Sequence, residues 1–276
     1  MKTGPSSSAP RALFEPRRLR AHVLRMAFHG QSVHVACAFS IIEILAVLHA
    51  CFLRLSRSDP LSANRDYLIL SKGHGVMALY ACFHELGWIS GCEMDQYFRD
   101  GTRLRGLCES HLPGCEVTSG SLGHGLPIAA GIALGLKRIG SDRRVYCIVG
   151  DGELNEGVMW ETILFAAHHE LGNLTMIVDA NQFQAMGRVE DVLALEPLID
   201  KFESFRWRAM ECNGHDITML SRTLATLTTI ATTPTALVAR TVKGYGVSFT
   251  AADNSWHYKR LSEEMYRQAL TELGDA

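Results

Sequence analysis

The chain has 276 residues, of which 47% are hydrophobic and 20% are charged, enough for one large domain with a buried core. The formal net charge of -2 argues against nucleic-acid binding, because binding to a phosphate backbone needs clustered basic surface. No apolar run is long enough to span a membrane, and the N-terminus lacks a signal-peptide core. The eight cysteines include no C-x-x-C pair, which is typical of a reducing compartment. We therefore expect a cytoplasmic protein.

The predicted elements begin after a polar N-terminal tail. Residues 1–16 are rich in Pro and Ser, and we expect them to be disordered. The remainder, residues 17–276, starts with a helical pattern, and residues 40–53 are apolar nearly all round, as in a buried helix. A short strand over residues 66–71 precedes another apolar helix. Residues 99–122 are rich in Gly, Pro and Ser, which is typical of a loop.

The second half of the chain alternates strands with helices. Continuous apolar strands are predicted over residues 144–149, 174–179, 207–212 and 235–241. One helical pattern lies between the first and second of these strands, and another lies between the third and fourth. Uninterrupted apolar strands are typical of a parallel sheet that is covered on both faces. The sequence therefore predicts an α/β fold, doubly wound around a mostly parallel sheet, in one domain over residues 17–276.

A Gly-Asp-Gly turn follows directly after one of these strands. Gly150 and Gly152 allow the backbone to approach a phosphate, and Asp151 offers an oxygen ligand to a hard cation. Asn181 lies at the end of the next strand, and strands of a parallel sheet bind ligands at their carboxyl ends. Gly-Asp-Gly alone is also a common turn. Together with Asn181 it predicts a magnesium and diphosphate site.

This pattern resembles the thiamine-diphosphate fingerprint of the transketolase family. The flanking segments Glu153-Leu-Asn-Glu-Gly157 and Leu171-Gly-Asn-Leu174 strengthen the resemblance, which extends over most of the chain. It implies that Asp151, Asn181 and the main-chain carbonyl of Phe183 hold Mg²⁺, or Ca²⁺ or Mn²⁺ in its place. The residues that it implies for thiamine diphosphate are His74, Gly120, Leu122, Gly123, Gly150, Asp151, Gly152, Glu153, Asn181 and His257. It places Glu156 at the interface with a partner chain.

Three histidines match catalytic positions of the family. His74 lies in Ser71-Lys-Gly-His74, and His257 follows the Lys243-Gly-Tyr-Gly246 loop. Both are expected to contact the cofactor diphosphate and the substrate. His34 matches a substrate-facing histidine, although the family's neighbouring glycines are absent. Histidine suits this work because it both donates and accepts protons near neutral pH.

Two departures from the family concern its specificity. Leu107 lies where transketolases carry a histidine that contacts the hydroxyl end of the donor, and leucine forms no hydrogen bond. His111 lies four residues further on, but a surface position is expected for it. His124 occupies a position that usually holds Gln. The change at Leu107 places the usual sugar-phosphate donor in question.

The resemblance also implies a partner. In the family, a second domain supplies the pocket for the cofactor pyrimidine and its essential glutamate, and no segment after Glu264 is expected to form that domain. We expect the partner to be the C-terminal, pyrimidine-binding subunit of a transketolase, in an α2β2 heterotetramer that is active only when complete. The expected reaction transfers a two-carbon ketol unit from a ketose or ketose phosphate to an aldehyde.

Other functions stay open. One is transfer of the same unit to an acceptor bound to a carrier protein or a lipoyl group, which the change at Leu107 motivates. Another is a scaffold subunit that binds the cofactor without turnover. A nicotinamide-binding Rossmann domain is disfavoured, because Gly120 to Gly125 does not form the G-x-G-x-x-G pattern and follows no strand.

Overall fold

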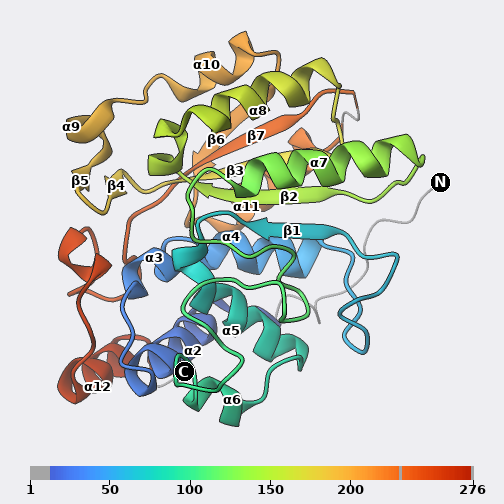
Figure 1. Ribbon diagram of the computed structural model, residues 1–276. Helices are drawn as coiled ribbons and strands as arrows, with labels where there is room; N and C mark the ends of the chain where they lie inside the picture. Colours follow the sequence, from blue (N-terminus) through green and yellow to red (C-terminus); the bar gives the residue numbers. More distant parts are fainter. Residues whose placement is uncertain (1–12, 230–231, 275–276) are drawn as a thin grey trace.

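Five parallel strands form the central sheet (Figure 1). The structure is a computed structural model that describes residues 13–229 and 232–274. Across the sheet, the strands follow the order β1 (Tyr67–Leu70), β2 (Val145–Gly150), β3 (Leu174–Ala180), β7 (Thr235–Arg240) and β6 (Arg208–Asn213). All four pairings between them are parallel, as expected for an α/β fold in which helices connect the strands.

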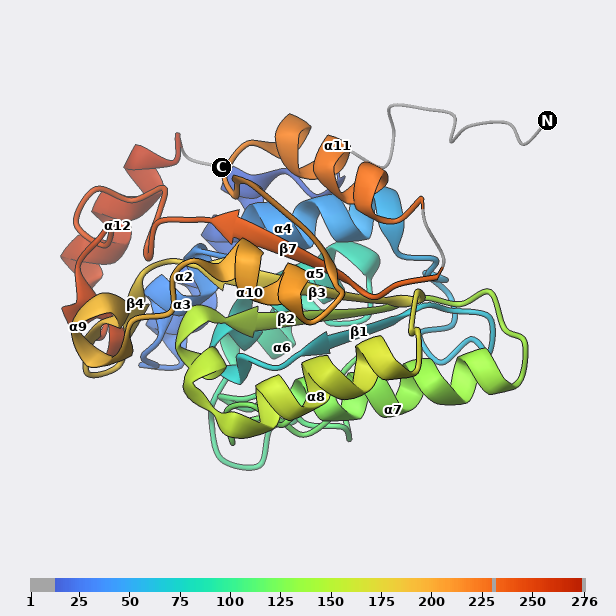
Figure 2. The ribbon, with the colours of Figure 1, turned by 90° about the horizontal axis from the view of Figure 1, so that it is seen from above.

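Helices cover both faces of this sheet, as the view from above shows (Figure 2). One face packs against α2 (Pro16–His29), α3 (Val35–Phe39), α4 (Ile42–Val47), α5 (Val76–Leu86) and α11 (Ile217–Leu227). The other face packs against α7 (Gly125–Arg138), α8 (Gly157–His168) and α10 (Leu198–Ser204). Among the described residues, the other α-helices are α6 (Gly91–Asp95), α9 (Val189–Leu193) and α12 (Glu263–Glu272).

The strands are apolar without interruption because both of their faces are buried. Along β2, Tyr146 and Ile148 belong to the core on the α4 side, whereas Cys147 and Val149 belong to the core on the α7 side. Successive side chains of a strand point to opposite faces, so each strand contributes to both cores. The predicted fold class is therefore confirmed, and within the central sheet the pairing is wholly parallel.

The predicted boundaries differ from the structure in two places. Residues 1–12 of the predicted tail lie outside the described residues, but Phe14 is only 5% exposed and packs against the ring of His49 at 5.4 Å between centroids. Helix α2 begins at Pro16, where proline is favoured in a first turn. The ordered chain therefore begins before Arg17. The prediction also missed a short antiparallel hairpin, β4 (Phe183–Gln184) and β5 (Gly187–Arg188), which leads into α9.

The strand ends determine where a ligand can lie. In the sheet register, Gly150 of β2 is level with Asp179 of β3, so the loops after both strands emerge side by side. The described part of the chain contains no helix that is long and apolar enough to cross a bilayer.

Candidate functional site

A cavity of about 660 Å³ opens at the carboxyl ends of β2 and β3. The turn after β2 continues as a short 3₁₀ helix, Asp151–Asn155, and supplies one wall. Strand β4, the turn that follows it and the end of α9 supply another wall. The predicted site residues that line this cavity are His34, His74, Leu122, Gly150, Asp151, Gly152, Glu153, Glu156, Asn181, Phe183 and His257.

The two other predicted cofactor residues, Gly120 and Gly123, lie behind this lining. The Gly123 amide donates a hydrogen bond of 2.9 Å to Glu153. Glu153 also accepts from the Gly150 amide at 2.8 Å and from the Ser71 hydroxyl at 2.6 Å. Both of its carboxylate oxygens are thus engaged with protein groups. Glu153 therefore joins three loops of the site and orients the turn that contains Asp151.

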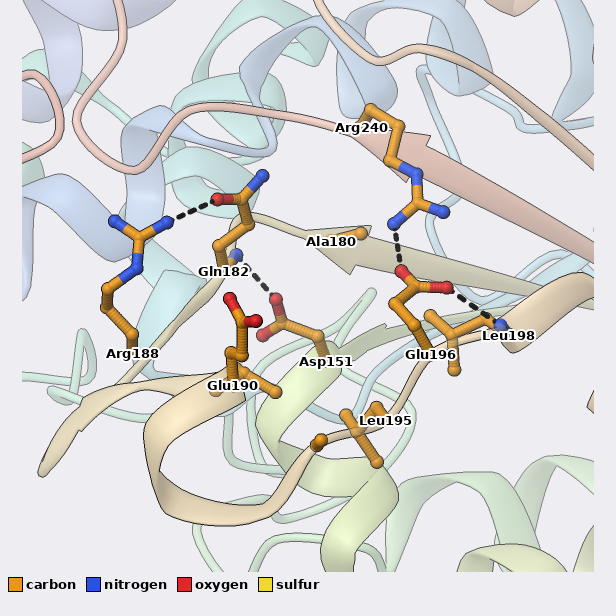
Figure 3. Close-up of a pocket in the computed structure, with 11 residues that line it drawn as sticks. Asp151, Ala180, Gln182, Arg188, Glu190, Leu195, Glu196, Leu198 and Arg240 are labelled. Carbon is orange, nitrogen blue, oxygen red and sulfur yellow. Dashed lines mark hydrogen bonds and ion pairs between the residues drawn. The ribbon is translucent and has the colours of Figure 1, made fainter.

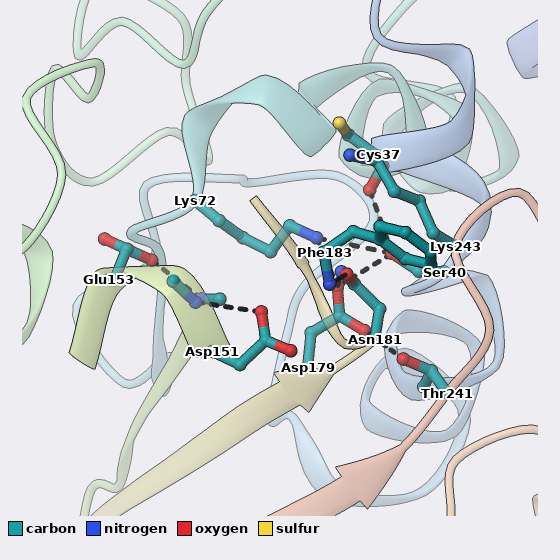
Figure 4. Close-up of polar contacts among 12 residues, drawn as sticks. Cys37, Ser40, Lys72, Asp151, Glu153, Asp179, Asn181, Phe183, Thr241 and Lys243 are labelled. Atoms are coloured by element: carbon teal, nitrogen blue, oxygen red, sulfur yellow. Dashed lines mark hydrogen bonds and ion pairs between the residues drawn. The ribbon is translucent and has the colours of Figure 1, made fainter. Parts of the chain in front are cut away.

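Asp151 and Asn181 present oxygen atoms at the floor of the cavity (Figure 4). The Asp151 carboxylate accepts from the amides of Gln182, at 2.6 Å, and Gly152, at 2.8 Å. Burial and the nearby Asp179 raise the pKa of Asp151 to about 7. A divalent cation would offset the free-energy cost of ionising this buried carboxyl group, because it stabilises the carboxylate and prefers oxygen ligands. Buried polar atoms without a hydrogen-bond partner also line the cavity, at Asn155 and Gln184.

A buried ion pair joins Lys72, which lines the cavity, to Asp179 beneath this floor. Lys72 donates to Asp179, which also accepts from Ser40 at 2.7 Å and from the Asn181 amide at 2.8 Å (Figure 4). Although burial opposes both charges, each partner stabilises the other, so the pKa of Lys72 is raised and that of Asp179 is lowered. The pair fixes the orientation of Asn181. Sequence analysis missed both residues, although Lys72 lies in the Ser-Lys-Gly-His segment.

Three histidines meet on another side of the cavity. The ring of His34 lies 4.8 Å from that of His74 and 4.8 Å from that of His257, between centroids. Burial, followed by the nearby His74, lowers the pKa of His34 to about 4. Burial and the nearby Lys243 lower the pKa of His257 to about 3, and burial also lowers the pKa of His74. All three are therefore neutral near pH 7 and can donate and accept protons.

Lys243 determines the tautomer of one of these histidines. Its ammonium nitrogen lies 3.0 Å from Nδ1 of His257 and 2.7 Å from the side-chain oxygen of Asn254. Because an ammonium group only donates, Nδ1 accepts and the proton of the neutral ring lies on Nε2. In the sequence, Lys243 was identified only as part of a loop motif, which does not predict that it fixes the His257 tautomer.

The thiol of Cys37 lies beside the histidines. Suitable ligand atoms of His34, Cys37 and His257 all lie within 4.8 Å of one another, which is compatible with a soft metal ion. The Lys243 ammonium group, however, already engages Nδ1 of His257 and would repel a second cation. We therefore interpret this cluster as part of an organic ligand site.

Leu107 does not line the cavity. Its side chain packs on the two loops that carry Gly73 and Gly120, and a Cβ atom added at these glycines would lie 3.4 and 2.9 Å from it. His111 does not replace the missing histidine, because its side chain is 43% exposed and bonds to the carbonyl of Arg103 at 2.9 Å. His124 is exposed at the start of α7.

A smaller pocket of about 290 Å³ shares Asp151 with the main cavity (Figure 3). Among its charged residues, Arg240 pairs with Glu196, and Arg188 donates to the uncharged Gln182 at 3.0 Å. None of the three histidines lines it. The main cavity is therefore the candidate active site.

The fold agrees with comparisons to known proteins. A family model described as the thiamine-diphosphate-binding domain of transketolase matches residues 17–276. The chain belongs to this family, and the predicted family is confirmed. The domain resembles transketolase of Campylobacter jejuni with a TM-score of 0.88 and 26% identity, over 98% of this chain. The chain spans only 43% of that enzyme's length.

Two relatives of similar length are named as single subunits of transketolases. The chain is 38% identical to one subunit of the apulose-4-phosphate transketolase of Actinobacillus succinogenes over 243 residues, 88% of each protein. It is 34% identical to one subunit of the 6-deoxy-6-sulfo-D-fructose transketolase of a Clostridium species over 241 residues, 87% of this chain and 88% of that relative. The predicted resemblance to one part of a split transketolase is therefore also confirmed.

Proposed function

We propose that this chain is the cofactor-binding subunit of a two-chain transketolase. The complex transfers a two-carbon ketol unit from a ketose or ketose phosphate to an aldehyde. The observation that carries this proposal is the meeting of Asp151, Asn181 and three neutral histidines in one cavity of a transketolase-family domain. The cavity has room for a cofactor and part of a substrate, at about 660 Å³.

The residues at the floor fit a metal-bound diphosphate. Asp151, Asn181 and the carbonyl of Phe183 would hold Mg²⁺, while the Gly152 amide, His74 and His257 would face the diphosphate. When bound, thiamine diphosphate supplies the carbanion chemistry that breaks and forms the carbon–carbon bond. The buried cations Lys72 and Lys243 favour a polyanion at this position by their charge.

The histidines handle the substrate hydroxyls. Since Nδ1 of His257 accepts from Lys243, its Nε2–H is available to donate a hydrogen bond to a substrate oxygen. His34 has a buried Nδ1 without a hydrogen-bond partner, which would gain one from a hydroxyl. His74 also lines the cavity, with its ring 4.8 Å from that of His34 between centroids, and would move protons there.

A partner chain completes the site in this proposal. Its support is that two relatives of nearly equal length are named as one subunit of their transketolases rather than as whole enzymes. Glu156 lies at the cavity edge and is exposed, as a contact with a partner requires. An α2β2 heterotetramer of this chain with a pyrimidine-binding subunit, located in the cytoplasm, remains our prediction.

The donor is a sugar whose identity does not follow from the relatives. Two relatives of comparable identity are named for different sugars, apulose 4-phosphate and 6-deoxy-6-sulfo-fructose. A donor panel assayed with the reconstituted complex, Mg²⁺ and thiamine diphosphate tests the proposal. Transfer to an aldehyde acceptor that vanishes in the Asp151→Ala complex would support it. A verified complex that binds the cofactor but transfers from no donor would favour the scaffold alternative.

A further inference from the structure

A buried ion-pair network lies outside the cavity, between three elements that are distant in sequence. Arg20 of α2 and Glu43 of α4 are each only 3% exposed, and their nearest atoms are 2.7 Å apart. His215, which precedes α11, lies with Nδ1 2.9 Å from the other Glu43 oxygen. Glu43 thus bonds to two side chains that are held by separate helices.

The network binds the loop 242–246 by its backbone. Arg20 Nε donates to the carbonyl of Tyr245 at 2.8 Å, and the amide of Val242 donates to Nε2 of His215 at 2.8 Å. Since Nε2 accepts, the proton of the neutral His215 ring lies on Nδ1 and is donated to Glu43. The ring of His215 also stacks on Tyr245, at 3.7 Å between centroids.

The loop 242–246 packs closely against its neighbours at two glycines, which leaves it no space to shift relative to the network. Gly246 has φ of +103°, and a Cβ atom there would lie 2.4 Å from Arg20 Nε. Gly244 has φ of +77°, and a Cβ atom there would lie 2.0 Å from the carbonyl oxygen of Thr250. The Gly244 amide donates to Ala36 of α3 at 3.1 Å. The loop is therefore held between the network and the helix that follows His34.

The same loop carries the residue that sets the tautomer of His257. Lys243 reaches Nδ1 of His257 at 3.0 Å from the middle of the anchored segment. A loop displacement of about 1 Å would break this bond, and a misplacement of that size costs about 100-fold in rate in enzymes.

We propose that Arg20, Glu43 and His215 are positioning residues for His257, acting through the anchored loop and Lys243. The inference rests on the proposed function only for the role of His257 in turnover. The tautomer and position of His257 can be measured without any reaction, so this part of the inference does not depend on the proposed function.

The chain contains a matched control for this network. Glu85 of α5 is also buried and pairs with an arginine and a histidine, Arg18 at 2.8 Å and His22 at 2.7 Å. Its side-chain bonds run to α2 and not to the loop. Loss of either carboxylate removes a buried charge and its bonds to an arginine and a histidine, although the Arg18 side chain is 52% exposed. Only loss of Glu43 disturbs the loop anchor.

The first experiment measures the imidazole nitrogen shifts of His257 by NMR in the full-length chain. We expect one Nε2–H tautomer in the wild type and in Glu85→Gln, and a mixture of tautomers in Glu43→Gln. If Glu43→Gln does not fold, two His215 variants replace it. His215→Gln keeps an acceptor for the Val242 amide, so His257 should keep its Nε2–H tautomer. His215→Asn keeps only the donor to Glu43, so His257 should show a mixture of tautomers.

The second experiment measures turnover in the reconstituted complex. We expect kcat to fall about 10- to 100-fold in Glu43→Gln with little change in donor KM, and to stay near the wild-type value in Glu85→Gln. In a His257→Ala background, Glu43→Gln should have little further effect, because the two act in series.

An unchanged tautomer in both Glu43→Gln and His215→Asn would overturn the inference, as would equal kcat losses in Glu43→Gln and Glu85→Gln. A wild-type complex without ketol transfer would contradict the proposed function instead. In that case the NMR comparison would still decide the positioning role.

Discussion

The floor and the histidine side of the cavity stabilise polar groups in opposite ways. The floor keeps charges in the interior, with Lys72 and Asp179 as an ion pair beneath Asp151. The histidine side keeps its rings neutral beside the Lys243 ammonium group, because burial lowers the pKa of His34 and His257 far below neutral pH. The difference indicates a division of work, in which the floor holds a cation and an anionic group, and the histidines exchange protons with a neutral substrate.

The largest expected effect comes from the floor. Asp151→Ala removes the buried carboxylate that fits Mg²⁺, so we expect at least about 100-fold weaker metal-dependent binding of thiamine diphosphate. Calorimetry with and without Mg²⁺ measures this. Denaturant unfolding without ligand checks that the variant folds, because the substitution leaves the Gln182 and Gly152 amides without their acceptor. Metal-dependent binding of thiamine diphosphate at the wild-type affinity would show that Asp151 is not a metal ligand.

The ion pair beneath the floor should matter mainly for stability. Lys72→Met leaves Asp179 as a buried charge without its cation, which costs about 3–5 kcal/mol of unfolding free energy. Denaturant unfolding measures this loss. Lys259→Met is the control, because Lys259 forms an exposed pair with Asp253 at 3.5 Å, worth at most about 1 kcal/mol. Equal losses in the two variants would show that the Lys72 pair is not structural.

The histidine side predicts a pH dependence of stability. The folded pKa of His257, about 3, lies below its ordinary value, so the folded state binds fewer protons than the unfolded state. Unfolding free energy should therefore fall as the pH drops from about 6.5 toward 4, with a shallower slope in His257→Gln. Unfolding curves at several pH values measure the slope, with His111→Gln as a control at an exposed histidine. Parallel slopes in the wild type and His257→Gln would contradict a neutral buried ring.

The smallest expected effect concerns Leu107. This side chain packs on the Gly73 and Gly120 loops rather than in the cavity, so Leu107→His should change the relative kcat/KM of two donors by only about 2- to 10-fold. Competition between ketose phosphate donors measures the ratio. A much larger switch of donor would place residue 107 in direct contact with the substrate.

The sequence predicted the parts of the site that depend on local pattern. Asp151 and Asn181 each follow an apolar strand, and parallel topology brings such positions together. The sequence did not predict the roles of Lys72, Asp179 and the Glu43 network. Their hydrogen-bond partners are 23 to 172 residues away in the chain, so no short motif contains both members of a pair. The hairpin β4–β5 was missed because its two-residue strands are too short to show a period.

The central claim is that this chain holds thiamine diphosphate with Mg²⁺ in a site that a partner completes. Isothermal titration of the cofactor tests it most directly, with this chain alone and with a candidate pyrimidine-binding partner chain. We predict binding that requires Mg²⁺ and is far tighter in the mixture. A verified complex that binds no cofactor would contradict the claim.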